Sequence, residues 1–255
     1  MIRAAAIVAS ALLLAYIAIP LAGLFFHLSP AQLAQALATP AALEALRLSV
    51  VTTLLSLALI VALGTPLAYI LARADFRGRR FVDALVDLPI VVPPAVAGLA
   101  LLLVFGRFGL LGHALGAVGI QLSFTTAAVV MAQVFVASPF YVRGARSGFL
   151  SVDRTLEAAS ATLGMGPLRT FANVTVPLAA SALIGGALLS WARALGEFGA
   201  TIMFAGNLAG VSQTLPLAVY LNLESGDISI ATALSVVMIV LSLITIVAVK
   251  TLEPR

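Results

Sequence analysis

The sequence contains no cysteine and very little charge, and each shortage excludes a class of protein. Without cysteine, the 255-residue chain forms neither a disulfide framework nor a thiolate metal site. Charged residues make up 9% of the chain, whereas 62% of its residues are hydrophobic and its mean hydropathy is +1.16. An ordinary soluble domain carries about 25% charged residues. The composition therefore predicts an integral membrane protein.

Motifs for enzymatic chemistry are also missing. The only lysine, Lys250, follows a valine and lacks the glycines of a phosphate-binding loop, so the chain is not expected to be an ATPase and we expect no cofactor in it. The sequence has no nucleophile elbow, zinc-protease motif or paired-carboxylate cleft. His27 and His113 lie far apart without neighbouring carboxylates, so they do not predict a metal site. No basic cluster is interleaved with aromatic residues over a polar face, which argues against nucleic-acid binding.

Six hydrophobic stretches are near the length of about 20 residues that a helix needs to cross the hydrocarbon core. We expect an all-α domain over residues 1–255, with spans at 4–26, 48–72, 88–105, 124–142, 176–195 and 228–249. Pro89, Pro93 and Pro94 are expected to loosen the start of the third span. Residues 31–47 predict a short external helix opened by Ser29 and Pro30. Residues 197–227 predict either a re-entrant segment packed within the protein or a long external loop.

Basic residues are distributed unevenly over this topology. With both termini inside, six spans place eleven basic residues in the cytoplasm: Arg3, Arg73, Arg77, Arg79, Arg80, Arg143, Arg146, Arg154, Arg169, Lys250 and Arg255. The opposite side receives three: Arg47, Arg107 and Arg193. This asymmetry follows the positive-inside rule, so we expect the loop at residues 151–177 to face the cytoplasm.

The loop at residues 151–177 is polar but carries an apolar pattern. Ser151 is expected to cap a helix whose first turn holds Asp153. One apolar stripe then follows at helical spacing: Leu156, Ala159 and Leu163. Residues 164–166, Gly-Met-Gly, interrupt this helix, and Pro167 can start a second one that carries Leu168 and Phe171. The pattern predicts a helix, a glycine break and a helix, with an apolar face turned to a partner protein or to the lipid surface.

This loop resembles the EAA loop in permease subunits of binding-protein-dependent ABC importers. The motif reads Glu-Ala-Ala, three residues, Gly, nine residues, then Ile-x-Leu-Pro. Residues 174–177, Val-Thr-Val-Pro, fit its end, and Gly164 stands at the required spacing before them. The Glu-Ala-Ala slot falls on residues 158–160, with Glu157 one residue early. The resemblance implies an ATPase-coupling site made of six residues: Glu157, Ala158, Ala159, Ser160, Gly164 and Pro177.

The same resemblance implies a type I ABC importer permease fold in a prokaryotic inner or plasma membrane. Its implied partners are an ABC ATPase subunit that binds ATP and Mg²⁺, a periplasmic or lipid-anchored binding protein, and a second copy of the chain. From residue 46 onward the chain looks like molybdate and sulfate permeases, and residues 214–243 look more like the molybdate ones. We therefore expect molybdate or tungstate as substrate, with a sulfate or thiosulfate importer as the alternative.

Four residues are candidates for the translocation path, and each has a structural alternative. Arg193 and Glu197 can pair on one helix face, or Arg193 can face an anion. Thr201 and Asn207 can donate weak hydrogen bonds to a dianion, or serve packing and loop structure. Because the other spans are almost free of charge, an ion-coupled secondary transporter or a channel is the weaker interpretation. The driving force is expected to come from outside the chain.

Overall fold

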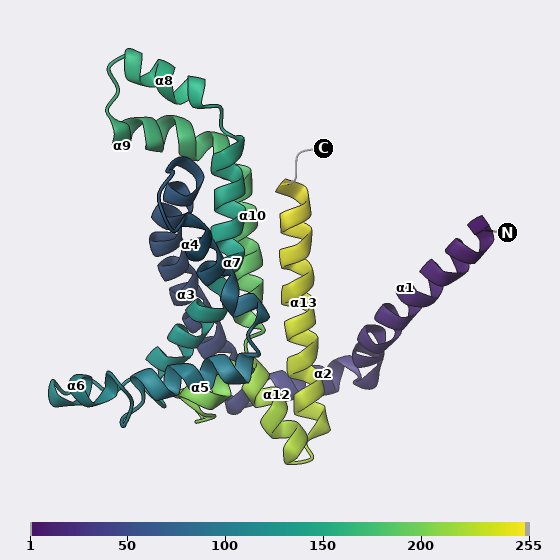
Figure 1. The fold of residues 1–255 in the computed structure, drawn as a ribbon. Helices are drawn as coiled ribbons and strands as arrows, with labels where there is room; N and C mark the ends of the chain where they lie inside the picture. Colours follow the sequence, from purple (N-terminus) through teal and green to yellow (C-terminus); the bar gives the residue numbers. More distant parts are fainter. Residues whose placement is uncertain (1, 253–255) are drawn as a thin grey trace.

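The computed structural model describes residues 2–252, which form helices and no β-strand (Figure 1). The helices are α1 (Ile2–His27), α2 (Pro30–Leu37), α3 (Pro40–Arg73), α4 (Arg79–Val91), α5 (Pro94–Phe105), α6 (Gly112–Ala117), α7 (Thr126–Ser151), α8 (Arg154–Thr162), α9 (Pro167–Thr170), the π-helical segment η1 (Phe171–Thr175), α10 (Val176–Leu195), α11 (Gly199–Ala205), α12 (Leu215–Glu224) and α13 (Ile228–Leu252). Arg255, which the topology assigned to the cytoplasm, lies outside the described residues.

Helix α7 is the centre of the bundle and packs against both α3 and α10. Small residues allow the close approach to α10. A Cβ at Gly144 would lie 2.9 Å from the Cα of Gly186, and one at Gly148 would lie 2.6 Å from the Cβ of Ala182. In lipid, where burying apolar side chains gains little, such close van der Waals packing is a main source of helix association. The glycines therefore fix the distance between α7 and α10.

Buried polar side chains join the same three helices. Gln133 of α7 accepts a hydrogen bond from Ser56 Oγ at 2.8 Å and donates one to Thr52 Oγ1 at 3.2 Å. Trp191 of α10 donates from Nε1 to Thr53 Oγ1 at 3.1 Å. These partners all lie on one face of α3. Interhelical hydrogen bonds of this kind fix the register of helices that apolar packing alone leaves free to slide.

The predicted third span at residues 88–105 is interrupted by a break of the helix near its start. The chain breaks at Val92 and Pro93, and α4 and α5 meet there with a bend of 114°. Val92 and Pro93 adopt extended backbone angles, as a residue before proline prefers. Pro93 and Pro94 have no backbone N–H to continue the helical ladder. The prolines do more than loosen the helix, since they turn α5 across the end of the bundle (Figure 1).

Three of the other predicted spans lie in longer helices, the predicted span at 176–195 coincides with α10, and the predicted span at 124–142 starts two residues before α7. Residues 4–26 lie in α1 and 228–249 in α13, while α3 starts at Pro40 and α7 runs on to Ser151. The expected helix at 31–47 is divided between α2, which Ser29 opens with a capping box, and the start of α3. Five helical segments are long and apolar enough to cross a membrane, or six if the bent pair α4–α5 counts as one span. This agrees with the all-α membrane fold.

The bundle has two distinct ends (Figure 1). Helices α8 and α9 lie at one end, whereas α5, α6 and α12 lie at the other. Helix α1 leaves the bundle at an angle, and α13 is the main helix that it contacts. No residue in the most apolar stretch of α1 is buried. Its apolar surface is therefore open to lipid or to another chain.

Residues 197–227 form α11, an extended loop and α12, and they pack within the protein. A Cβ at Gly98 of α5 would lie 2.6 Å from the carbonyl oxygen of Ala200 of α11. A Cβ at Gly199 would lie 2.7 Å from the Cβ of Pro94. These approaches leave no space between α5 and α11. The segment fits the packed alternative better than the external loop, and α5 and α11 form one unit.

The packing of α7 on α10 predicts opposite effects for two glycines. Gly144→Ala should destabilise the protein by about 1–3 kcal/mol, because the new Cβ overlaps the α10 backbone. Gly185→Ala is the matched control, since nothing lies within 4 Å of a Cβ there and alanine is the better helix former by ~1 kcal/mol. Thermal unfolding in detergent measures both. Equal melting temperatures for the two variants would contradict the close α7–α10 contact.

Candidate functional site

The polar loop begins differently from the sequence prediction. Ser151 does not cap α8: it ends α7, where its Oγ donates to the carbonyl of Gly148 at 2.7 Å. Asp153 is the cap, and its carboxylate accepts from the backbone N–H of Thr155 at 2.9 Å. This hydrogen bond lowers the pKa of Asp153 below its usual value, so the cap stays ionised at neutral pH. Both residues can cap a helix, but α7 extends far enough to include Ser151.

The predicted helix, glycine break and helix are confirmed. Helix α8 ends at Thr162, and Gly164 adopts a φ of +84°, which residues with a side chain rarely reach. Pro167 then starts α9 in the first helical turn, where its missing N–H costs nothing. From α9 the helix continues through η1 into α10 without a break. The exposed Pro177 follows the π-helical turn, in which the N–H of Val176 bonds to the carbonyl of Phe171.

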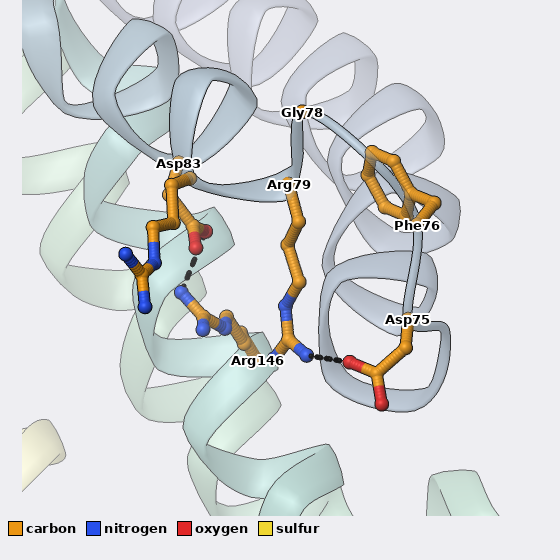
Figure 2. Close-up of a pocket in the computed structure, with 7 residues that line it drawn as sticks. Asp75, Phe76, Gly78, Arg79, Asp83 and Arg146 are labelled. Atoms are coloured by element: carbon orange, nitrogen blue, oxygen red, sulfur yellow. Dashed lines mark hydrogen bonds and ion pairs between the residues drawn. The ribbon is translucent and has the colours of Figure 1, made fainter.

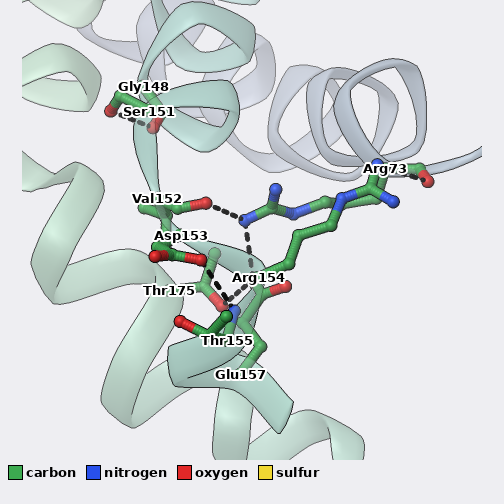
Figure 3. Close-up of polar contacts among 9 residues, drawn as sticks. All are labelled: Arg73, Gly148, Ser151, Val152, Asp153, Arg154, Thr155, Glu157 and Thr175. Carbon is green, nitrogen blue, oxygen red and sulfur yellow. Dashed lines mark hydrogen bonds and ion pairs between the residues drawn. The ribbon is translucent and has the colours of Figure 1, made fainter.

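Glu157 ties the inner face of α8 to the membrane helices (Figure 3). Its Oε1 accepts from Arg73 Nη2 at 3.0 Å and from Thr175 Oγ1 at 2.7 Å. The same Arg73 Nη2 donates to the carbonyl of Val152 at 3.0 Å. Arg73 is the last residue of α3, and Thr175 ends η1. One carboxylate therefore connects α8 to the ends of α3 and α10, and both charged side chains are mostly buried.

Ser160 also faces inward, and the remaining coupling candidates face outward. Ser160 is buried, and its hydroxyl lies 2.9 Å from that of Thr170 of α9, which joins the two helices across the glycine break. Ala158 and Ala159 are exposed. The six candidates therefore divide into an anchoring pair, Glu157 and Ser160, and four residues that the rest of the chain leaves uncovered.

The outer face of the α8–α9 pair carries apolar side chains that nothing else in residues 2–252 covers. Leu163 is 81% exposed and Leu168 is 85% exposed, and Leu156 is exposed as well. The predicted stripe is therefore present, but it points away from the bundle. Phe171 is the exception, because its ring packs on Tyr69 with the centroids 4.9 Å apart. We call the exposed surface of Leu156, Leu163 and Leu168 the docking face.

Arg193 and Glu197 pair at the opposite end of α10. Arg193 Nη2 lies 2.7 Å from Glu197 Oε2. Glu197 is only 1% exposed, and its Oε1 accepts from the backbone N–H of Ala200, which caps the first turn of α11. Arg193 keeps 26% of its side chain exposed. The salt-bridge interpretation is confirmed, and Glu197 is committed to this pair and to the cap.

Thr201 and Asn207 lie in structural positions. Thr201 is fully buried, and its Oγ1 has no hydrogen-bond partner among the described residues. Asn207 donates from Nδ2 to the carbonyl of Leu217 at 3.2 Å and accepts from Gln213 Nε2 at 3.0 Å. Asn207 thus fixes the loop after α11 against α12. Of the four path candidates, Arg193 alone combines an exposed cationic group with a place at a helix break.

Sequence reasoning missed Arg73 and Thr175 as site residues. Arg73 was assigned only to the basic side of the membrane, and Thr175 only to the end of a motif. The signal that could have found them is weak: a cation at the end of a membrane-length helix and a carboxylate in the docking loop on the same side.

No group of three or more His, Asp or Glu residues that could hold a metal occurs in residues 2–252.

Comparison with known proteins identifies the family. A family model described as "Binding-protein-dependent transport system inner membrane component" matches residues 64–255. The chain belongs to this family. It is therefore the membrane-spanning, non-enzymatic component of an ABC importer and lies in the inner membrane, and the ATPase is a separate subunit. The family, membrane location and non-enzymatic role expected from the sequence are confirmed.

Individual members of the family give the closer comparison. The chain is 40% identical to "Molybdenum transport system permease protein ModB" of Mycobacterium tuberculosis, over 94% of this chain and 90% of that protein. It is 41% identical to "Molybdate/tungstate transport system permease protein WtpB" of Pyrococcus furiosus, over 76% and 74%. "Probable sulfate transport system permease protein cysT" of Chlorokybus atmophyticus is 32% identical over 86% and 77%.

A solved structure shares the fold. The match is a bacterial ABC transporter involved in the import of the acidic polysaccharide alginate, with a TM-score of 0.76 and 14% identity over 99% of this chain and 96% of that chain. At this identity the likeness carries the fold alone. It confirms the type I ABC importer permease fold for the α1–α13 chain.

The Glu157 contacts predict that the negative charge of Glu157 holds α8 against the ends of α3 and α10. Glu157→Gln should lower the free energy of local opening of α8 by about 1–2 kcal/mol, because hydrogen bonds to charged groups contribute more than neutral ones. Amide hydrogen exchange at residues 155–163 should then be about five- to thirty-fold faster. Arg154→Gln is the control, since Arg154 is exposed and makes only a 3.5 Å contact to the Arg73 carbonyl. Unchanged exchange in Glu157→Gln would contradict the anchoring role.

The Arg193–Glu197 pair predicts unequal losses of stability. Arg193→Gln leaves the buried Glu197 carboxylate without its counter-charge and should cost about 3–5 kcal/mol. Glu197→Gln should cost less, because the amide oxygen can still accept from Ala200 and the partly exposed Arg193 can be hydrated. Thermal unfolding of the two variants in detergent measures the difference. If Glu197→Gln is the less stable of the two, the hydrogen bond from Ala200 to Glu197 contributes more to stability than the ion pair with Arg193.

Proposed function

We propose that this chain is the permease through which molybdate or tungstate enters the cell, driven by a separate ATPase that docks on α8 and α9. Two relatives at 40–41% identity carry molybdenum or molybdate/tungstate in their names, whereas the sulfate relative is 32% identical. This difference supports molybdate or tungstate over the sulfate alternative. Both are tetrahedral dianions, so one path with weak contacts serves either.

The observation that carries the docking proposal is a helix pair with an apolar outer face and an anchored inner face. Leaving leucines in water is costly, since burying one fully gains about 1.5–3 kcal/mol. The lipid surface is the other possible cover. However, Figure 1 places α8 beyond the end of α13, a helix of membrane-crossing length. This position favours a protein partner, for which the glycine break and the exposed Ala158 and Ala159 allow close backbone approach.

The importer we propose has four kinds of component. Two copies of this chain form the path, each docked on an ATPase subunit that binds ATP and Mg²⁺ in the cytoplasm. A periplasmic or lipid-anchored binding protein delivers the oxyanion at the opposite end, where α5, α6 and α12 lie. Both termini are then cytoplasmic, as the basic residues indicate. The uncovered apolar length of α1 supports a second copy, because it offers surface beyond what the chain itself buries.

The connections of α8 supply a mechanical route for alternating access. When the ATPases close on ATP, a displaced α8 acts on the end of α3 through the Glu157–Arg73 ion pair. It also acts on α10 through α9 and η1, because these three form one continuous helix. The far end of α10 carries the Arg193–Glu197 pair and the cap of α11, which is packed against α5. Movement at the cytoplasmic end thus reaches the opposite end through α10, which α9 meets at an angle (Figure 1).

Among the four path candidates, we assign contact with the anion to Arg193 and supporting roles to the other three. Arg193 offers positive potential, but its pairing with Glu197 keeps the local charge near neutral. A dianion therefore meets a weak site that it can leave again, as transport requires. Glu197 positions Arg193 and α11. Thr201 and Asn207 support α11 and the loop that follows it.

The substrate assignment is tested by uptake of labelled molybdate into vesicles that contain this chain with its ATPase and binding protein. We expect uptake that needs ATP and that tungstate, but not excess sulfate, inhibits. Inhibition by sulfate would instead indicate a sulfate importer. Uptake indifferent to ATP and to the partner proteins would contradict the importer and favour a secondary transporter or channel.

The same assay tests Arg193. Measured per folded transporter, Arg193→Gln should lower molybdate uptake by about ten-fold or more, the loss expected for one charged hydrogen bond. Glu197→Gln keeps the cation but removes the charge that weakens the site, so it should lower uptake per folded transporter less than Arg193→Gln does. Equal residual uptake in the two variants would assign both residues to structure alone.

A further inference from the structure

A basic cavity lies at the same end of the bundle as α8 but outside the docking face. Its volume is about 560 Å³, within the range of ligand pockets. It is bounded by the loop between α3 and α4, the start of α4 and one residue of α7. Seven residues line it: Asp75, Phe76, Gly78, Arg79, Arg80, Asp83 and Arg146. Nothing in the proposed docking or transport path uses these side chains.

The arginines of the cavity converge from two elements (Figure 2). Arg79 of α4 reaches toward Asp75, and Arg146 of α7 reaches toward Asp83. Arg146 Nη1 lies 2.6 Å from Asp83 Oδ1, and both side chains are largely buried. This pair fixes Arg146 in place and, with the Arg143–Asp87 pair at 2.7 Å, holds α4 on α7. The Arg146–Asp83 pair therefore positions Arg146 on the wall of the cavity.

The remaining charges are free to meet a ligand. Arg79 Nη1 lies 2.8 Å from Asp75 Oδ1, but the Asp75 side chain is 97% exposed. Such an exposed pair contributes only ~0–1 kcal/mol and opens easily. Arg80 is exposed and makes no ion pair among residues 2–252. Three arginines thus face two aspartates, one of which can turn into solvent, and the cavity keeps an excess of positive charge.

The surroundings place this excess charge at the level of lipid headgroups. The cavity follows directly on Arg73, the end of a helix of membrane-crossing length. Phe76 is exposed beside the arginines, and Phe81, the next residue after Arg80, is 71% exposed. Aromatic side chains are concentrated at membrane–water interfaces, and basic pockets between membrane helices on the cytoplasmic side bind anionic headgroups.

We propose that this cavity binds a phosphate-like tetrahedral oxyanion, held by Arg79 and Arg80 with Arg146 as the third cation. Guanidinium groups suit this ligand because their paired N–H donors match the oxygens of a phosphate. The oxyanion can come from two sources, the headgroup of an anionic phospholipid or a free anion of the cytoplasm. A bound oxyanion joins the start of α4 to α7. The proposal requires the membrane orientation but neither the ATPase nor the identity of the transported anion.

The lipid source is tested with the purified full-length chain in nanodiscs of mixed phosphatidylglycerol and phosphatidylcholine. Native mass spectrometry measures the ratio of the two lipids retained on the protein. We expect a preference for phosphatidylglycerol that falls about ten-fold or more in Arg80→Gln, the loss expected for a hydrogen bond between charged groups. Arg77→Gln is the matched control, because Arg77 is an exposed arginine of the same loop that does not line the cavity.

A second variant should act in the opposite direction. Asp75→Asn removes the exposed carboxylate that competes for Arg79, so it should increase the preference for phosphatidylglycerol. The free-anion source is tested by equilibrium dialysis of labelled inorganic phosphate against the chain in pure phosphatidylcholine nanodiscs, with the same three variants. Binding that depends on Arg80 in either experiment supports the site and identifies the source.

Two results would overturn the proposal. One is an equal loss in Arg77→Gln and Arg80→Gln, which would show a general effect of surface charge. The other is the absence of both lipid preference and phosphate binding in the unaltered chain. Because neither experiment involves transport, a failure here leaves the proposed importer untouched, and a failure of molybdate uptake leaves this site untouched.

Discussion

The structure depends on one buried charge pair at the end of α3. Arg73 and Glu157 lie 84 positions apart in the chain, yet their contact joins the last residue of a membrane helix to the first turn of α8. Thr175, at the end of η1, donates a hydrogen bond to the same carboxylate oxygen. Beside it, the rings of Tyr69, Phe149 and Phe171 pack edge to face or tilted, which joins α3, α7 and η1 through apolar contact. Without this junction, α8 and α9 would be an exposed hairpin with no defined angle to the bundle.

The bundle below this junction is suited to transmitting a displacement. Glycines bring α7 within contact distance of α10 and α5 within contact distance of α11, and Gln133 fixes α7 against α3. Two helix breaks lie at the far end of the bundle, at Val92–Pro93 between α4 and α5 and at Gly196–Phe198 between α10 and α11. Both breaks lead into the same α5–α11 unit. A packed bundle with such a unit at its far end is what two alternating states require, because packed interfaces change between discrete arrangements rather than deforming smoothly.

Local sequence features predicted the local structure well. Ser29 and Pro30 open a helix, and Gly164 and Pro167 divide α8 from α9, because a cap, a positive φ and a missing N–H each act within a few residues. The direction of the α4–α5 bend was not predictable, since prolines show where a helix ends but not where the next one points. Asp153, and not Ser151, is the cap because α7 continues beyond the apolar stretch that predicted it. The added turns carry Arg143 and Arg146, which pair with aspartates of α4. The burial of Thr201 and the Arg73–Glu157 contact arise from tertiary packing, which no local pattern records.

The central claim is that the docking face of α8 and α9 contacts a separate ATPase. The chain contains no cysteine, so Leu163→Cys introduces a unique attachment point on that face. A photoreactive reagent attached there, in the assembled transporter in membranes, should cross-link to the ATPase subunit. The same reagent on Leu110→Cys, an equally exposed leucine between α5 and α6 at the opposite end, should not. Cross-linking of Leu163→Cys to lipid alone, in a complex shown to contain the ATPase, would contradict the account and make α8 a helix on the membrane surface.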